Sequence, residues 1–223
     1  MTTPDVLPDG PVTRVTRPAV IAKRLVRVRG GTPQRIGIFG GTFDPPHIGH
    51  LVAALDAQQG LKLDVVLLVV ANSPWQKVGS RPISPAADRL AMVEAAVSGQ
   101  ASLQVSDIEI QRGGLSFTAD TLTTLGEAEP GAELFVILGN DAAAGFATWE
   151  RHDEVVRLAT LVVVDRPGTP TPIDDGFDWT RINIPELEIS STELRQRVAD
   201  GRSIDYLTPP AVVTCISERG LYR

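Results

Sequence analysis

Residues 40–50, Gly-Gly-Thr-Phe-Asp-Pro-Pro-His-Ile-Gly-His, decide the fold of this chain. They follow an apolar run at 35–40 that predicts a buried strand, and they precede residues 51–55, Leu-Val-Ala-Ala-Leu, which predict a helix. Gly40 and Gly41 let the backbone approach a ligand closely, because glycine has no Cβ. A helix that begins after such a turn offers N–H groups and a positive dipole end to an anion. The stretch therefore predicts a strand, a phosphate-binding turn and a helix in that order.

Strands and helices are expected to alternate along the rest of the chain. Continuous β-branched and leucine runs predict buried parallel strands, and an alternating run predicts a further one. The expected later strands span residues 65–70, 103–110, 134–138, 161–164 and 181–187. Helices are expected after Ser84-Pro85 as far as Gly99, over 119–125 after Thr118, over 192–199 after Ser190 or Ser191, and from Pro209-Pro210 to near Gly220. This rhythm predicts an α/β fold, a doubly wound, mostly parallel, Rossmann-like sheet with helices on both faces.

Length and composition limit the class of protein. The chain has 223 residues, of which 43% are hydrophobic and 22% charged, as in an ordinary globular domain. Its longest apolar run, seven residues from Val65 to Ala71, is far shorter than the roughly 20 residues of a membrane span. The single Cys215 excludes an internal disulfide and fits a reducing compartment. With no secretory signal in residues 1–20, a cytoplasmic location without membrane contact is expected.

The charge is unevenly distributed along the chain. Residues 1–34 hold six basic and two acidic side chains, a net charge of +4. Because the whole chain has a net charge of −6, residues 35–223 carry −10. The first segment also holds five prolines, so we expect a disordered basic extension over 1–34 and one domain over 35–223. The alternatives for residues 20–28 are a strand-like arm, an adaptor for a partner, or part of a misassigned start that is never translated. An acidic domain argues against general nucleic-acid binding, so a phosphate ligand needs a local site.

Two histidines give the turn its chemistry. His47 and His50 are three residues apart, so on a first helical turn they share a face and can donate N–H groups to one phosphate chain. An isolated pair at this spacing is usually a packing or surface pair. A zinc site needs a third ligand, and only His152 and Cys215 remain among histidines and cysteines. The chain has no P-loop motif, and the glycine fingerprint of dinucleotide-binding folds is missing after the first strand.

At this point the sequence resembles a known family, the bacterial nicotinate-nucleotide adenylyltransferases of the nucleotidyltransferase superfamily. Residues 40–51 are similar to its GGTFDPxHxGHL motif, and residues 189–195, Ile-Ser-Ser-Thr-Glu-Leu-Arg, are similar to ISSTxxR. Residues 109–122 match ExxRxGxS(Y/F)TxDTL, and residues 138–149 match (I/L)GxDxxxxxxxW. Pro74-Trp75-Gln76-Lys77 stands where many members have PPHK, so Trp75 and Gln76 replace the second proline and the histidine of that motif. The match runs from Arg35 to the end of the chain.

The resemblance implies the roles of particular residues. His47, His50 and Arg195 would act on the transferring phosphates as the catalytic groups, and Lys77, Thr118 and Trp149 would hold the pyridine nucleotide. The ATP-binding residues would be Gly40, Gly41, Thr42, His47, His50, Gly139, Asp141, Ser190, Ser191 and Arg195. The residues also allow simpler roles: a capping box of Ser190 with Glu193, a helix cap at Thr118, core packing for Trp149, a loop aspartate at Asp141 and a solvated lysine at Lys77. Asp44 is expected to be structural, fixing the turn before Pro45.

The implied reaction transfers the adenylyl group of ATP to nicotinate mononucleotide and gives deamido-NAD and pyrophosphate, a step of NAD biosynthesis. The attacking phosphate is already ionised near neutral pH, so positioning and electrostatics would supply most of the acceleration. Mg²⁺ would arrive with ATP, since no dedicated carboxylate cage is visible.

The alternatives are an adenylyltransferase that prefers nicotinamide mononucleotide, a pantetheine-phosphate or cytidylyl transferase, a nucleotide-binding regulator without catalysis, and a nucleic-acid module that uses the basic extension. A homo-oligomer is possible. Whether Trp75 gates the empty site is left open.

Overall fold

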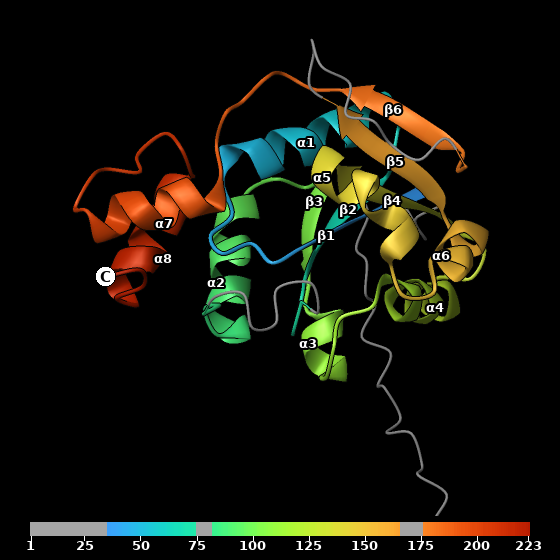
Figure 1. Cartoon of the computed structure of the whole chain (residues 1–223), viewed down its shortest axis with the longest axis horizontal. Helices are drawn as coiled ribbons and strands as arrows, with labels where there is room; N and C mark the ends of the chain where they lie inside the picture. Colours follow the sequence, from blue (N-terminus) through green and yellow to red (C-terminus); the bar gives the residue numbers. More distant parts are fainter. Residues whose placement is uncertain (1–34, 75–81, 166–175) are drawn as a thin grey trace, which may run out of the picture.

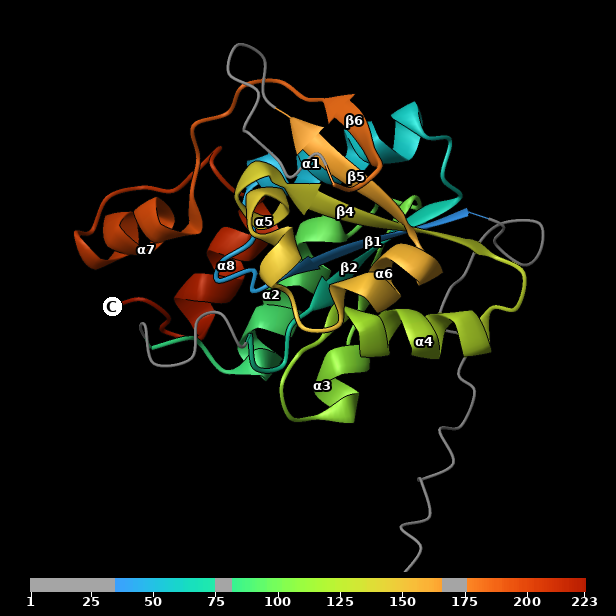
Figure 2. The same ribbon diagram turned by 45° about the vertical axis from the view of Figure 1, so that its right-hand side comes forward.

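The computed structural model describes residues 35–74, 82–165 and 176–223. Six parallel strands form one sheet in the order β3-β2-β1-β4-β5-β6. The strands are β1 (Arg35–Gly41), β2 (Val65–Val70), β3 (Leu103–Ser106), β4 (Glu133–Gly139), β5 (Thr160–Asp165) and β6 (Trp179–Asn183). The expected doubly wound sheet is therefore confirmed, and every described strand of it is parallel (Figures 1 and 2).

Helices cover both faces of the sheet and extend beyond one edge (Figure 1). They are α1 (Ile48–Gly60), α2 (Ala86–Val97), α3 (Ile108–Arg112), α4 (Thr118–Ala128), α5 (Asn140–Ala144), the 3₁₀ turn η2 (Phe146–Thr148), α6 (His152–Leu158), α7 (Ser191–Ala199) and α8 (Pro210–Glu218). No helix within the described ranges is long and apolar enough to span a bilayer.

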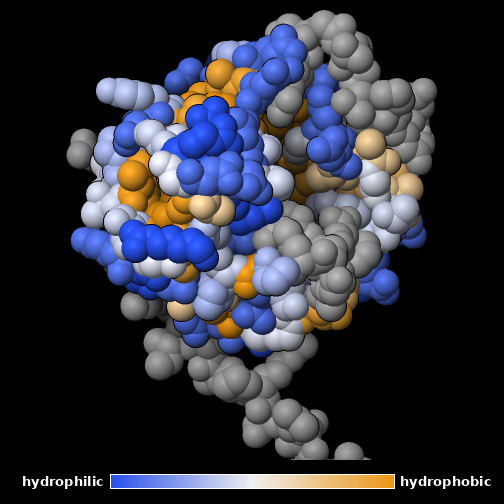
Figure 3. Space-filling model, turned by 60° about the vertical axis from the view of Figure 1, so that its left-hand side comes forward, coloured by the Kyte–Doolittle hydropathy of each residue, from blue (hydrophilic) through white to orange (hydrophobic). Residues whose placement is uncertain are grey.

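The alternation of side chains along each strand divides the core in two. Ile36 and Ile38 of β1 pack with α4 and α6 on one face, through residues such as Leu122 and Val155. On the other face, β-strand residues pack with Ala54 and other small residues of α1. A third cluster joins α2 to α7 and α8, which lie beside α2 and away from the sheet in Figure 2. On the face that Figure 3 presents, hydrophilic residues surround separate hydrophobic patches.

Several expected boundaries are wrong. The strand expected over 103–110 ends at Ser106, because Ile108 and Glu109 turn into α3 and are buried there as helix residues. The strand expected over 181–187 spans Trp179–Asn183, since its register with β5 ends where Asn183 pairs with Asp165. The sequence also predicts a loop over Asp165–Asp178, which is rich in proline, glycine and aspartate, but Asp165 is the last residue of β5, and residues 166–175 lie outside the described residues.

The caps also differ in detail from expectation. The cap of α2 is Pro85 and not the Ser84 hydroxyl, and the cap of α4 is Phe117, which makes Thr118 the first helical residue. Ser190 caps α7, and its Oγ accepts the N–H of Glu193 at 3.1 Å. The carboxylate of Glu193 instead accepts from Arg197. The described domain starts with β1 at Arg35, so the proposed extension 1–34 lies outside the described residues.

Candidate active site

The sheet has its topological switch point between β1 and β4. The chain runs from β1 to β2 and β3 on one side and continues from β4 on the other. In open α/β sheets of this kind, ligands bind beyond the carboxyl ends of the strands at that point. Gly40 and Gly41 end β1, and Gly139 ends β4, so three glycines flank the crevice. A Cβ on Gly40 would meet no atom within 4 Å, which leaves the space above the strand open to a ligand.

Two cavities meet at this crevice. The smaller, of about 230 Å³, extends toward α4 and is lined by Thr118 and Trp149. The larger, of about 760 Å³, extends toward α7 and is lined by His47, His50 and Arg195. Both are lined by Phe39, Gly40, Gly41, Thr42, Gly139 and Ala142. The structure therefore has room for two ligands whose ends meet over the same glycine-rich turn.

The histidine pair is ordered by contacts on several sides. His47 precedes α1 as its N-cap, and the His47 and His50 rings stack with centroids 3.7 Å apart. The main-chain N–H of His47 donates to Nδ1 of His50 at 3.2 Å. An Nδ1 that accepts carries no proton, so neutral His50 holds its proton on Nε2 and can donate from that atom. A Cβ on Gly49 would lie 3.1 Å from Nδ1 of His47, so glycine suits this position.

The C-terminal segment holds the turn between β1 and α1 residue by residue. Arg195 donates from Nη1 to the carbonyl of Asp44 at 2.7 Å, and the Ser191 hydroxyl donates to the carbonyl of Pro45 at 2.8 Å. The Thr208 hydroxyl donates to the carbonyl of Pro46 at 2.8 Å. Arg195 also donates from Nη2 to the Thr192 hydroxyl. Ser191 and Arg195, expected to clamp phosphate, thus line the larger cavity while they brace the turn that forms its floor.

The expected nucleotide-side residues are brought together. Ser190, Ser191 and Arg195 of the α7 region and Asp141 of α5 line the same cavity as His47 and His50. Asp141 is exposed there. Ser190 has the capping role that the sequence allowed for it.

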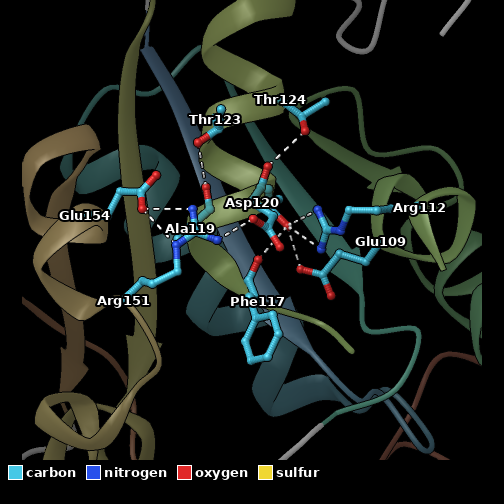
Figure 4. A network of polar contacts seen from close by, with 10 residues as sticks. Glu109, Arg112, Phe117, Ala119, Asp120, Thr123, Thr124, Arg151 and Glu154 are labelled. Carbon is cyan, nitrogen blue, oxygen red and sulfur yellow. Dashed lines mark hydrogen bonds and ion pairs between the residues drawn. The ribbon is translucent and has the colours of Figure 1, made fainter. Parts of the chain in front are cut away.

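An ion pair ties the two walls of the smaller cavity. Thr118 begins α4, and Trp149 precedes α6. Two residues beyond each of these, Asp120 and Arg151 form an ion pair at 2.5 Å, and Arg151 also pairs with Glu154 (Figure 4). Hydrogen bonds to Asp120 and then Glu154 raise the pKa of Arg151 above its ordinary value, so its charge is permanent. The pair keeps α4 next to the segment that carries Trp149.

A buried carboxylate lies in the wall of the smaller cavity. Glu109 of α3 is 6% exposed, and its Oε1 accepts the Thr121 hydroxyl at 2.8 Å (Figure 4). Arg112 approaches that hydroxyl at 3.4 Å from both Nη1 and Nη2. Because a guanidinium can only donate, the hydroxyl proton points at Glu109. Glu109 belongs to a segment matched to the family motif, yet the sequence alone gave it no role.

Sequence reasoning also missed Arg89, Asn72 and Tyr222. Arg89 is 1% exposed in α2 and donates to main-chain carbonyls, including that of Thr42 at 2.9 Å. Asn72 joins the end of β2 to the segment before α4. Tyr222 donates to the side chain of Asp44. An arginine at a core-facing position of an amphipathic helix is a signal that could have found Arg89.

Two residues singled out in the sequence, Lys77 and Asp44, do not have the outcome of the others. Lys77, together with Trp75, lies outside the described residues. Asp44 is structural, but through distant partners: its carboxylate accepts from the Tyr222 hydroxyl and from the N–H of Ser84. Within the described ranges, no group of three or more histidine, cysteine or acidic side chains could hold a metal ion. The larger cavity offers the histidine pair and the Arg195 guanidinium, donors that suit phosphate, beside the acidic residues Asp44, Asp141 and Glu186.

Comparisons with known proteins agree with this geometry. The family model for cytidylyltransferase-like proteins matches residues 38–197. A Corynebacterium kroppenstedtii protein named "Probable nicotinate-nucleotide adenylyltransferase" is 44% identical over 84% of this chain and 90% of its own length. A Thermus thermophilus protein of the same name is 45% identical over 85% of this chain and its full length. The Plasmodium falciparum nicotinic acid mononucleotide adenylyltransferase, solved with NaAD, has a similar fold, with a TM-score of 0.67 to 0.68 in two complexes and 22–23% identity over 85% of this chain and 97% of its own.

The parallel sheet, its glycine-rich switch point and the histidine pair over the larger cavity define an α/β nucleotidyltransferase. Within that class, the chain belongs to the family of nicotinate-nucleotide adenylyltransferases.

Proposed function

We propose that this chain transfers the adenylyl group of ATP to nicotinate mononucleotide, forming deamido-NAD and releasing pyrophosphate. The observation that carries the proposal is the meeting of two cavities over Gly40, Gly41 and Thr42. The smaller one has an aromatic wall at Trp149 that suits a pyridine ring. The larger one has the phosphate donors. A mononucleotide in the first and ATP in the second would place their phosphates side by side.

In this reaction the 5′-phosphate oxygen of the mononucleotide attacks the α-phosphorus of ATP, and the bond to the pyrophosphate oxygen breaks. The nucleophile is already an anion, so no general base is needed. The Nε2–H of His50 would donate to the phosphate that gains charge, with His47 stacked beside it. Arg195 would bind phosphate oxygens from its place at the start of α7. Holding both substrates in line and offsetting their charge would supply most of the acceleration.

The remaining ligand roles follow from position. Thr118, at the first turn of α4, and Trp149 would hold the pyridine end, and Lys77 would reach phosphate. Gly139, Asp141, Ser190 and Ser191 would line the ATP site. Phosphoryl-transfer enzymes use ATP with a divalent metal ion, and here Mg²⁺ would come bound to the nucleotide, offset phosphate charge and keep several waters. The lining fits that arrangement: His47, His50 and Arg195 supply N–H groups and a cation to phosphate, and among the described residues no group of three or more histidine, cysteine or acidic side chains would hold the metal by itself.

One observation favours a second candidate substrate, nicotinamide mononucleotide. The Glu109 carboxylate lies in the wall of the pyridine cavity and could accept from a carboxamide, whereas it would repel a carboxylate that came near. The first turn of α4 lies across the same cavity, and its N–H groups and dipole favour the acid. The relatives are named after the nicotinate nucleotide, and we therefore place nicotinate mononucleotide first.

The test is pyrophosphate release from ATP and Mg²⁺ with either mononucleotide. We expect kcat/KM for nicotinate mononucleotide to exceed that for nicotinamide mononucleotide at least about tenfold, since one ligand charge at a helix N-terminus is worth about 1–2 kcal/mol. The control is Asp56, an α1 residue outside the residues that line either cavity: the Asp56→Asn variant should keep the same ratio. Equal rates would favour the broader substrate range, and release with neither substrate would contradict the proposal.

A further inference from the structure

Arg89 occupies an unusual position for a charged side chain. It lies in α2, is 1% exposed, and is among the largest fully buried side chains. Its guanidinium donates to four main-chain carbonyls: Ser84 O from Nε at 2.9 Å, Thr42 O and Ala71 O from Nη1 at 2.9 and 2.6 Å, and Asn72 O from Nη2 at 3.0 Å. Burying a charge is costly unless it is hydrogen-bonded, so these contacts are a condition for its place in the fold.

On one side, Arg89 fixes the turn that both substrates share. Thr42 lines both cavities and directly follows β1. The same Nη1 atom that holds the Thr42 carbonyl holds the carbonyl of Ala71, which directly follows β2. One nitrogen thus binds the residues that follow two neighbouring strands, next to the main-chain hydrogen bond from Ala71 N–H to Gly41 O at 3.0 Å.

On the other side, Arg89 is connected to the wall of the smaller cavity. Its Nη2 holds the carbonyl of Asn72. The N–H of Asn72 donates to Ser116 Oγ at 2.9 Å, and its side-chain amide donates to Gly114 O at 2.8 Å. The N–H of Ser116 returns a hydrogen bond to the carbonyl of Ser73 at 3.1 Å. Ser116 lines the smaller cavity, two residues before α4.

We propose that Arg89 is a positioning residue that sets the spacing between the two substrate subsites, through Thr42 on the nucleotide side and through Asn72 and Ser116 on the pyridine side. This inference rests on the proposed function. It follows because two phosphates react in line only when both are placed accurately, and a displacement of about 1 Å can cost about 100-fold in rate. A lysine has one nitrogen where the guanidinium has three, so it cannot reach all four carbonyls in the same geometry.

The first test is Arg89→Lys, compared with Arg157→Lys at an exposed position of α6 as the matched control. Both variants are assayed well below their unfolding temperatures, and rates are divided by the concentration of folded protein. We expect kcat of Arg89→Lys to fall about 100-fold and the control to match the wild type. A folded Arg89→Lys enzyme with kcat within twofold of wild type would overturn the proposal, because a purely stabilising arginine affects only the folded fraction.

The second test keeps the question decidable if Arg89→Lys does not fold. Asn72→Ala removes only the side-chain bond to Gly114, on the exposed side of the connection. We expect its KM for nicotinate mononucleotide to rise about fivefold while KM for ATP stays within twofold, as the loss of one hydrogen bond of about 1 kcal/mol requires. Unchanged KM values for both substrates would overturn the proposed connection.

Failure of the proposed function would be recognised separately. In that case the wild-type chain itself would release no pyrophosphate with either mononucleotide. Calorimetric titration with nicotinate mononucleotide alone and with a non-hydrolysable ATP analogue alone would then test the positioning. Weaker binding of the mononucleotide to Asn72→Ala, with unchanged binding of the ATP analogue, would support it, and equal binding of both would contradict it.

Discussion

The hydroxyl of Tyr222 donates a 2.7 Å hydrogen bond to Oδ1 of Asp44, which lies in the turn between β1 and α1. Asp44 is 1% exposed, and its main-chain carbonyl accepts from Arg195. Residues beyond α6 therefore hold both the side chain and the backbone of this turn. The wall of the larger cavity is thus completed by a segment that is remote in sequence.

This contact makes stability depend on pH in the alkaline range. Burial, and then the hydrogen bond to Asp44, raise the pKa of Tyr222 above its ordinary value of about 10. The folded chain therefore keeps the proton at pH values where the unfolded chain loses it. The stabilisation is fully present below pH about 10 and is lost as the pH rises toward the higher folded pKa. Denaturant unfolding at pH 8 to 11 should show wild type losing stability faster than Tyr222→Phe above pH 10. Tyr206→Phe is the control, because Tyr206 is 94% exposed, and parallel curves for wild type and Tyr222→Phe would contradict the assignment.

At neutral pH, Tyr222→Phe should weaken both stability and catalysis. The change leaves one oxygen of a buried carboxylate without this donor, and it should cost about 1–3 kcal/mol of unfolding free energy. Because Asp44 lies in the same turn as His47, three residues before it, we expect kcat to fall several-fold in the folded enzyme. Steady-state rates and denaturant unfolding measured on the same preparation separate these effects. A lower stability with an unchanged kcat would show that the contact does not position the turn.

His50→Ala should lower kcat by about 10²–10³ with the fold intact, since donors to developing phosphate charge contribute on this scale. His50→Gln places an N–H donor near the Nε2 position, and we expect it to recover part of the loss. Circular dichroism verifies folding, and pyrophosphate release gives kcat. Near-normal turnover of His50→Ala would exclude this histidine from the reaction.

Trp149 should contribute more to binding of the mononucleotide than to the free energy of unfolding. Its Nε1 is buried with no hydrogen-bond partner among the described residues, so Trp149→Phe removes an unsatisfied donor and should change the unfolding free energy by less than about 1 kcal/mol. Its ring lines the smaller cavity, so Trp149→Ala should raise KM for nicotinate mononucleotide about tenfold and leave KM for ATP nearly unchanged. Trp179→Phe is a suitable comparison, because Trp179 packs against Phe146 without lining either cavity. Equal effects on both KM values would argue against ring stacking.

Deleting residues 1–34 should leave kcat and both KM values within twofold of the full chain. Arg35 is the first residue that the structure describes, and its N–H donates to Asp64 while its side chain pairs with Glu133. Deleting residues 1–36 removes these contacts together with the fully buried Ile36, and it should lower the unfolding free energy by several kcal/mol. Thermal unfolding and activity of the two truncations give the comparison. Loss of activity in the shorter deletion would assign a function to the extension.

Local patterns in the sequence were enough to predict most of the fold. The continuous apolar run of β2 is fully buried, as a central parallel strand should be. Ser190 could be identified as a helix cap from its neighbours alone. The strand expected over 103–110 is partly wrong because the alternation breaks at Ser106-Asp107: the apolar Leu103 and Val105 are out of phase with Ile108 and Ile110, and α3 begins at that break.

The sequence by itself determined the class of fold and the chemistry of the glycine-rich turn, since strand periodicity, glycine, proline and histidine spacing are local properties of the chain. Only the tertiary structure decided that Ser191, Arg195, Thr208 and Tyr222 brace that turn and that Arg89 joins Thr42 to Asn72. These hydrogen bonds link residues 17 to 178 positions apart, and many are made to main-chain carbonyls, which every residue type carries. Their partners are therefore set by how the elements pack and cannot be inferred from side-chain identity.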